Sequence, residues 1–188
     1  MAVVIEQQAR RWTYEQYYVL DDDRRYEIID GQLLMVPSPD AWHQDWLGNL
    51  YVLLRQQLAR TKAGRLFIAP FDVVLDSENT VQPDLIFVAA ANTGIIERRA
   101  IFGVPDLLVE LVSPSSVRRD RRDKKVLYAR FGVKEYWIGD PADKSMEILA
   151  LQGGRYQRLC AATGKGKLVS KVLPRLKLDL AEIQSPPE

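Results

Sequence analysis

Two carboxylates lie in surroundings that make an acidic side chain costly. Glu110 stands inside the apolar run 107–112, and Asp84 follows Pro83 at the start of the apolar run 85–88. Burying a carboxylate is expensive unless it is paired or binds a metal, so acidic residues are seldom fully buried without a partner. Glu110 is therefore expected either to hold a metal ion or to form a salt bridge with an arginine or lysine. Asp84 is either a second ligand or the cap of a turn.

A basic segment follows, in which Asp120, Lys124 and Tyr128 are spaced four residues apart. On a helix these three side chains share one face, which would place a cation beside the carboxylates if it turns toward Glu110. We expect Asp120 to hold Lys124 or the helix start, and Tyr128 to pack in the core with its hydroxyl bonded. The alternative is an exposed, salt-bridged helix face, because six basic residues crowd this segment: Arg118, Arg119, Arg121, Arg122, Lys124 and Lys125.

His43, the one histidine of the chain, stands near the start of a predicted helix. A histidine there can contact a substrate or take part in proton transfer. The other interpretation is a capping or packing residue. Because Cys160 is the one cysteine, the chain lacks the ligands of a His-rich or Cys-rich zinc site.

The hydrophobic pattern predicts a mixed α/β domain that positions these residues. Helices are expected over 13–20, 41–62 (ended by Gly64) and 117–131, with a last helical turn at 178–183. The strand 106–112 is apolar on both faces except at Glu110, which is typical of a central strand covered on both sides. Both long helices are expected to pack on the sheet. The other predicted strands are 25–30, 32–36, 66–69, 72–75, 85–90, 135–139, 146–150 and 156–160, the first two and the last two forming hairpins.

Composition excludes several classes of protein. Of 188 residues, 47% are hydrophobic and 27% charged, unlike a disordered, collagen-like or disulfide-rich chain. The longest apolar run, 85–91, is far below the ~20 residues of a membrane helix. Residues 6–8 are polar where a signal peptide would be apolar, and a single cysteine excludes an internal disulfide. We therefore expect a cytoplasmic protein with no membrane partner.

Charge is distributed unevenly along the chain, although the net charge is only +1. Residues 1–117 carry 10 basic and 16 acidic residues, a net of −6, whereas residues 118–147 carry +3 and residues 148–188 carry +4. Such asymmetry suggests an anionic partner on one face, or solvated charges on two sides of one fold.

A series of ordered motifs resembles the Uma2 family, a bacterial family regarded as endonucleases. The resemblance spans roughly residues 13–160. It rests on Arg25-Tyr26-Glu27-Ile28-Ile29-Asp30-Gly31, Pro37-Ser38-Pro39 with His43-Gln44, Gln82-Pro83-Asp84-Leu85, the segment from Pro105-Asp106 through Glu110 to Ser113-Pro114, Asp120 with Lys124 and Tyr128, Gly132-Val133-Lys134-Glu135-Tyr136-Trp137, and Asp140-Pro141.

The resemblance implies the restriction-endonuclease-like fold, in which helices flank a central mixed β-sheet, here with additional β-hairpins. It also implies the PD-(D/E)xK active site of that superfamily, with a Mg²⁺ or Mn²⁺ cofactor. Asp84 and Glu110 match the metal-binding acids. The residue two positions after Glu110 is Val112 rather than lysine, and Lys124 matches a catalytic lysine that has migrated to the following helix. Glu27 matches an upstream acidic position that can complete the site.

The implied function is metal-dependent hydrolysis of DNA phosphodiester bonds. His43, Arg118, Arg119, Arg121 and Arg122 are then candidate substrate-binding residues, and a homodimer would supply two sites for the two strands of a duplex. The alternative is an inactive nucleic-acid-binding or structural module that keeps the nuclease fold, which the absence of lysine at position 112 favours.

We expect one domain over residues 1–188, with a nuclease-like core at 13–160 and a C-terminal extension at 161–188. Further basic residues that would contact phosphates are Arg155, Arg158, Lys165, Lys167 and Lys171.

Overall fold

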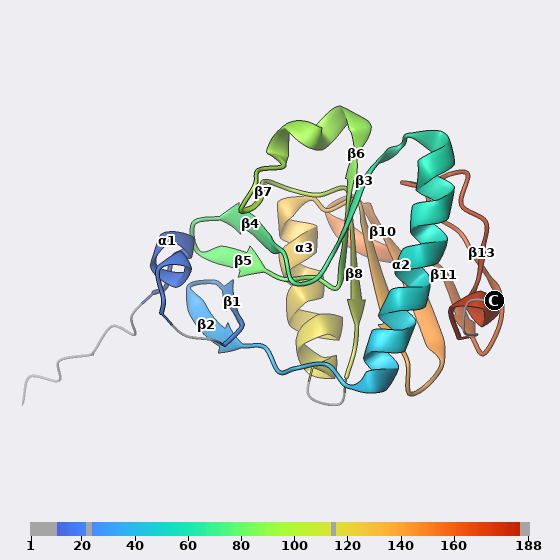
Figure 1. Ribbon diagram of the computed structural model, residues 1–188, viewed down its shortest axis with the longest axis horizontal. Helices are drawn as coiled ribbons and strands as arrows, with labels where there is room; N and C mark the ends of the chain where they lie inside the picture. Colours follow the sequence, from blue (N-terminus) through green and yellow to red (C-terminus); the bar gives the residue numbers. More distant parts are fainter. Residues whose placement is uncertain (1–10, 22–23, 114–115, 185–188) are drawn as a thin grey trace, which may run out of the picture.

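A mixed six-stranded sheet forms the centre of the molecule, in the order β11-β10-β9-β8-β6-β3 (Figure 1). The computed structural model describes residues 11–21, 24–113 and 116–184. Strands β8 and β9 are parallel, and the other neighbours are antiparallel. The predicted central mixed sheet is thus confirmed, with strand ends shifted by a few residues. Its strands are β3 (Gly64–Ile68), β6 (Leu85–Ala89), β8 (Leu107–Leu111), β9 (Glu135–Asp140), β10 (Ser145–Gln152) and β11 (Arg155–Thr163).

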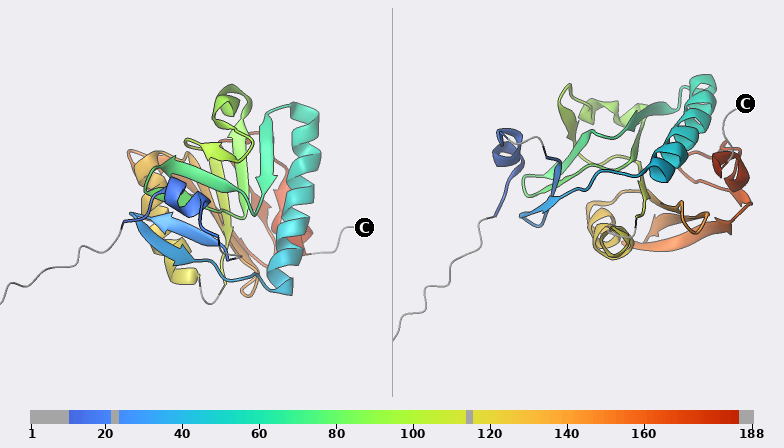
Figure 2. Two further views of the ribbon diagram at one scale, coloured as in Figure 1. Left: turned by 60° about the vertical axis from the view of Figure 1, so that its left-hand side comes forward. Right: turned by 60° about the horizontal axis from the view of Figure 1, so that its bottom comes forward.

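Two helices cover opposite faces of this sheet, as predicted (Figure 2). Alternate strand residues point to opposite faces, so Leu107 and Val109 pack under helix α2 (Ala41–Thr61), while Leu108 packs under helix α3 (Lys125–Phe131). Glu110 shares the face of Leu108. This alternation is why a carboxylate in an apolar strand reaches the helix that carries the basic residues.

A second, five-stranded sheet packs its inner side chains into the same core as α3. Its predicted Asp-Gly hairpin is confirmed, since Asp30 and Gly31 adopt the positive φ angles of 50° and 76° that this turn requires. Strands β5 and β7 escaped prediction because three residues are too few to show a period. The sheet has the order β2-β1-β5-β4-β7, with β1 (Tyr26–Ile29), β2 (Gln32–Met35), β4 (Asp72–Asp76), β5 (Asn79–Val81) and β7 (Ala100–Phe102).

The two helices nearest the N-terminus begin where their sequences indicate but end earlier than predicted. Thr13 and Gln16 form a capping box on α1 (Tyr14–Tyr18), which is shorter than predicted. Helix α2 ends at Thr61, and its C-cap is Lys62, whose φ of 51° is left-handed, rather than Gly64 as expected. Gly64 instead lies in β3, where a Cβ atom would stand 2.1 Å from the Val88 carbonyl oxygen.

The segment predicted as one helix over 117–131 is built in two parts. Its first turns form a π-helix, η2 (Arg119–Lys124), which leads directly into α3. π-Helical turns occur mostly as short insertions and are frequent at functional sites. Asp120 and Lys124 are buried on one side of this turn, whereas Arg121 and Arg122 are exposed.

The chain after β11 folds back and packs against α2. It contains β12 (Lys167–Leu168), β13 (Leu178–Asp179) and α4 (Leu180–Gln184), so the predicted helical turn begins two residues later than expected. Leu173, Leu180 and Ile183 join the core under α2. A short 3₁₀ helix, η1 (Ala90–Ile95), follows β6. Within the described part of the chain, no helix has the length and apolarity needed to cross a membrane.

A single buried carboxylate, Glu135, anchors this C-terminal segment. It accepts hydrogen bonds from the Ser170 hydroxyl at 2.7 Å, from the Val172 N–H at 2.9 Å and from the Lys171 N–H. The Trp137 indole donates a further bond at 3.0 Å. All four donors bind a carboxyl group that is fully removed from solvent.

We expect Glu135→Gln to lower the free energy of unfolding by about 1–3 kcal/mol, because a buried donor loses its acceptor. Amide hydrogen exchange should show faster exchange at Lys171 and Val172 than in the wild type. The matched control is Glu147→Gln, a half-buried glutamate whose partners are Arg121 and Arg158. If Lys171 and Val172 exchanged no faster in Glu135→Gln than in Glu147→Gln, the anchoring role of Glu135 would be contradicted.

Candidate active site

Four predicted residues converge where β6 and β8 pair, carried by four separate elements. Glu27 comes from β1, Asp84 directly precedes β6, Glu110 lies in β8 and Lys124 ends η2. The pairing of Leu85 with Val109 sets Asp84 beside the end of β8. The structure thus brings together residues separated by almost a hundred positions in the chain.

Lys124 is the centre of a buried carboxylate–lysine cluster, which consists of Glu27, Glu110, Asp120 and Lys124. The Nζ atom lies 2.8 Å from Glu27 Oε1, 2.9 Å from Glu110 Oε1 and 3.5 Å from Asp120 Oδ1. Only 4% of Lys124 is exposed. Burial lowers the pKa of this ammonium group, but the three carboxylates outweigh burial and hold the pKa well above its ordinary value. Lys124 is therefore a fixed positive charge.

Glu110 is both paired and buried, so the salt bridge considered from the sequence is present. Besides Lys124, the Tyr128 hydroxyl donates a 2.7 Å hydrogen bond to Glu110 Oε1, which confirms that Tyr128 is a core residue with its hydroxyl bonded. Burial raises the pKa of Glu110 well above its ordinary value, and nearby carboxylates add to the rise while Lys124 opposes it. Burial likewise raises the pKa of Asp120.

Asp84 is held by donors on both of its oxygens. The Leu111 N–H donates to Oδ2 at 2.6 Å, and His43 Nε2 lies 2.9 Å from Oδ1. His43 is placed by the first turn of α2, whose N-cap Asp40 accepts the His43 N–H. Burial lowers the pKa of His43, but the hydrogen bond and charge of Asp84 prevail and raise that pKa. The Asp84 carboxylate is therefore oriented rather than free to rotate.

The donor set of this site fits a hard divalent cation. Four carboxyl groups, those of the cluster and Asp84, surround one lysine and one histidine, so the site offers more oxygen ligands than cationic partners. Mg²⁺ is usually held by one or two protein carboxylates together with waters and substrate oxygens. Across residues 11–21, 24–113 and 116–184, no three His, Cys, Asp or Glu side chains group into an all-protein metal cage. The pair Asp84 and Glu110, predicted from the sequence as the metal-binding acids, would be such a smaller set.

The predicted substrate-binding arginines lie outside the cluster. Arg118 and Arg122 are exposed and Arg119 is half-buried. Arg121 lies 3.5 Å from Asp140 and 4.0 Å from Glu147, which draws it toward β9 and β10. In the hydrogen bonds and ion pairs of the described residues, none of these four contacts Asp84 or the cluster.

Sequence reasoning missed Gln82, a buried residue that links the site to its surroundings. Its backbone N–H donates to Glu27 Oε1 at 2.9 Å, which orients the carboxylate that holds Lys124. Its side-chain oxygen accepts a 3.0 Å bond from Arg25 Nε. The available signal was its place directly before Pro83-Asp84, since a polar residue at a strand entrance needs partners once it is buried.

The helix-flanked mixed sheet is the restriction-endonuclease-like α/β fold, as predicted. A solved structure described as "a putative nuclease belonging to DUF820 from Anabaena variabilis ATCC 29413" shares this fold, with a TM-score of 0.74. The two chains are 15% identical over 91% of this chain and 96% of that one. The Uma2 family model, described as "Putative restriction endonuclease", matches residues 13–181, so the chain belongs to the Uma2 family.

No curated protein sequence matches the chain. The family and the fold together support a nuclease role, and a nuclease role implies a nucleic-acid substrate.

Proposed function

We propose that the protein is a metal-dependent endonuclease that hydrolyses DNA phosphodiester bonds through Asp84, Glu110, Lys124 and Glu27. One observation carries the proposal. Glu110 of β8 lies 2.9 Å from a buried lysine that reaches it from the next helical segment, and Asp84, directly before the paired strand β6, adds its charge beside Glu110. Buried charges of this density are costly for stability alone, and perturbed pKa values in such clusters are typical of functional sites.

In this proposal Asp84 and Glu110 hold Mg²⁺ or Mn²⁺. Such an ion supplies two things when bound: a lowered pKa for a coordinated water and charge stabilisation on the scissile phosphate. The chain contributes orientation. His43 and the Leu111 N–H keep the Asp84 oxygens in one direction, so the carboxylate does not have to be ordered when substrate arrives.

Lys124 acts as a charged donor and not as a base, because its pKa lies well above the ordinary value. A positioned ammonium group can orient the attacking water and stabilise the negative charge that develops on the phosphate. Glu27 and Asp120 hold the Nζ atom in place, at 2.8 and 3.5 Å. Glu27 is therefore assigned as a positioning residue for Lys124.

Substrate binding in this proposal uses His43 and the basic residues of η2, namely Arg118, Arg119, Arg121 and Arg122. Clustered arginines neutralise backbone phosphates without reading sequence. We propose a bacterial cytoplasmic protein acting on DNA, with a homodimer as the arrangement that brings two sites to a duplex.

The test is cleavage of supercoiled plasmid by the wild-type protein in Mg²⁺, in Mn²⁺ and in EDTA, with Mn²⁺ binding measured by calorimetry. We expect nicked or linear product with either ion, none with EDTA, and Mn²⁺ binding to the free protein. A protein that binds no Mn²⁺ and cuts no DNA would overturn the proposal.

A binding or structural module is the second candidate, because Glu110 Oε1 already accepts bonds from both Lys124 and Tyr128. Under that alternative, Glu110→Gln changes the free energy of unfolding while wild-type protein shows no cleavage with either ion.

A further inference from the structure

Arg25 presents a partly buried guanidinium group whose outer nitrogens are free. Its Nε atom donates a 3.0 Å hydrogen bond to Gln82 Oε1. Among residues 11–21, 24–113 and 116–184, neither Nη1 nor Nη2 has a hydrogen-bond or ion-pair partner. A guanidinium group carries five N–H donors and is always charged. The charge of Arg25 opposes the burial that raises the pKa of the nearby Asp72, but its outer N–H groups bond to none of the described residues, so this half-buried group still has donors to offer an anion.

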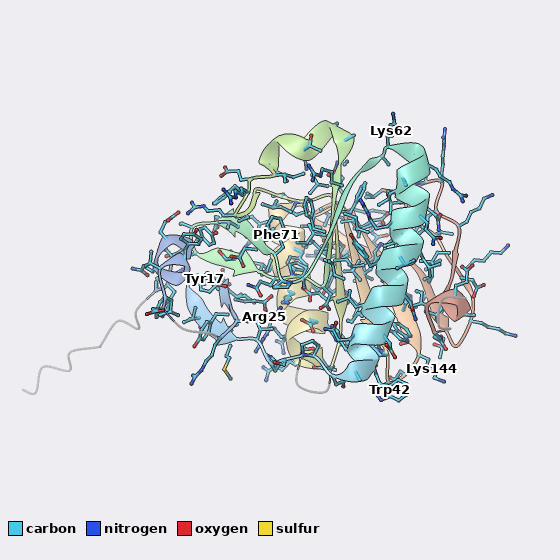
Figure 3. The ribbon with its side chains drawn as sticks, viewed as in Figure 1. Tyr17, Arg25, Trp42, Lys62, Phe71 and Lys144 are labelled. Atoms are coloured by element: carbon cyan, nitrogen blue, oxygen red, sulfur yellow. The ribbon has the colours of Figure 1, made fainter. Side chains whose placement is uncertain are left out.

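The guanidinium group of Arg25 lies close to the candidate active site. Arg25 stands two residues before Glu27, so the two side chains leave the same face of the chain as it enters β1. Gln82 binds both of them, Glu27 through its backbone N–H and Arg25 through its side chain. Gln82 also directly precedes Pro83-Asp84. In the view of Figure 3, Arg25 lies between the β1–β2 hairpin and α3.

The orientation of the fork is set by a hydrogen-bond chain. Gln82 Nε2 donates to Asp72 Oδ1 at 2.8 Å and to the Tyr17 hydroxyl at 3.1 Å. These two bonds fix which end of the Gln82 amide faces Arg25, and only 8% of Gln82 is exposed. Arg25 is thus held through Nε, so less conformational freedom is lost when Nη1 and Nη2 bind a ligand.

We propose that Arg25 binds a backbone phosphate of the nucleic-acid substrate, next to the phosphate that is cut. This inference rests on the proposed function. Two residues along a strand advance about 6.6 Å, so Arg25 stands one step away from the Glu27–Lys124 contact rather than on it. The planar fork matches two phosphate oxygens at once, which a lysine cannot reproduce.

The test is fluorescence anisotropy of a short labelled DNA duplex, with Ca²⁺ replacing Mg²⁺ so that binding is measured without cleavage. We expect Arg25→Met to weaken binding about tenfold and to reduce the slope of log K against log salt by about 0.9, the loss of one phosphate contact. Arg25→Lys should keep the wild-type slope and recover only part of the affinity. The matched control is Arg55→Met, an exposed arginine on α2, which should leave both quantities unchanged.

The outcomes separate this inference from the proposed function. Wild-type cleavage and binding together with unchanged affinity and slope in Arg25→Met would overturn the inference and leave the nuclease in place. Lost cleavage with unchanged DNA affinity would also overturn it, since Arg25 would then act only through Gln82. If Arg25→Met fails to fold, Arg25→Lys decides, because wild-type affinity in that variant excludes a two-oxygen contact. Wild-type protein that binds Mn²⁺ but no duplex would overturn both proposals.

Discussion

Replacing Lys124 with methionine is expected to lower the free energy of unfolding by about 3–5 kcal/mol. The ammonium group compensates three buried carboxylates, those of Glu27, Glu110 and Asp120, at 2.8 to 3.5 Å. Methionine fills a similar volume, so the loss measures charge rather than a cavity. With the cation gone, the carboxylates must either stay ionised beside one another or take up protons, and both cost free energy.

Urea denaturation monitored by circular dichroism measures this loss, with Lys125→Met as the matched control. Lys125 is the next residue along the same helix but is only half-buried, so its variant should stay within about 0.5 kcal/mol of the wild type. Adding Glu110→Gln to Lys124→Met should restore part of the stability, because one uncompensated charge is removed. A loss of less than about 1 kcal/mol for Lys124→Met would contradict the central role of this lysine. It would mean that the cluster is solvated in solution.

The same variant also bears on the proposed reaction. If Lys124 is the migrated lysine of the nuclease site, plasmid cleavage should disappear at temperatures where Lys124→Met remains folded. Cleavage at the wild-type rate by folded Lys124→Met would keep the metal site and remove the lysine from the mechanism.

The parts of the fold that repeat a pattern were predictable. Strand alternation around Glu110 predicted a doubly covered central strand, and the four-residue spacing of Asp120, Lys124 and Tyr128 predicted a shared face. Both hold, since Lys124 and Tyr128 bond to Glu110. The spacing survives even though η2 is a π-helix, because four residues bring the side chains back to nearly the same side in either winding.

The parts that depend on contacts between distant segments were not predictable. Strand β5 exists because Thr80 pairs with Ile28 of β1 and Val74 of β4, and nothing local in three residues reveals such a partner. The role of Gln82 likewise lies in four hydrogen bonds, three of them to residues more than 50 positions away in sequence. Arg25 belongs to the sequence motif that contains Glu27. That only its Nε atom is bonded within the described part of the chain, and to Gln82, could be seen only in the structure.

Asp84→Asn is expected to slow plasmid cleavage by about 1,000-fold, the equivalent of about 4 kcal/mol of transition-state stabilisation. The substitution keeps the shape of the side chain and an oxygen that can accept the Leu111 N–H. It removes one of the two charges proposed to hold the metal ion. Because Asp84 also adds negative charge beside the buried Glu110, its neutralisation should leave the free energy of unfolding within about 1 kcal/mol of the wild type.

Calorimetric titration with Mn²⁺ distinguishes loss of the ion from loss of the fold. We expect Asp84→Asn to bind Mn²⁺ much more weakly, while Asp45→Asn, an exposed aspartate two residues beyond His43, binds and cleaves as the wild type does. Wild-type cleavage by Asp84→Asn would exclude this residue from the metal site and leave its contacts with His43 and Leu111 as structural. Weak Mn²⁺ binding with an unchanged unfolding transition would instead support Asp84 as a metal ligand. The contacts of Asp84 with His43 and Leu111 would then orient that ligand and contribute little to stability.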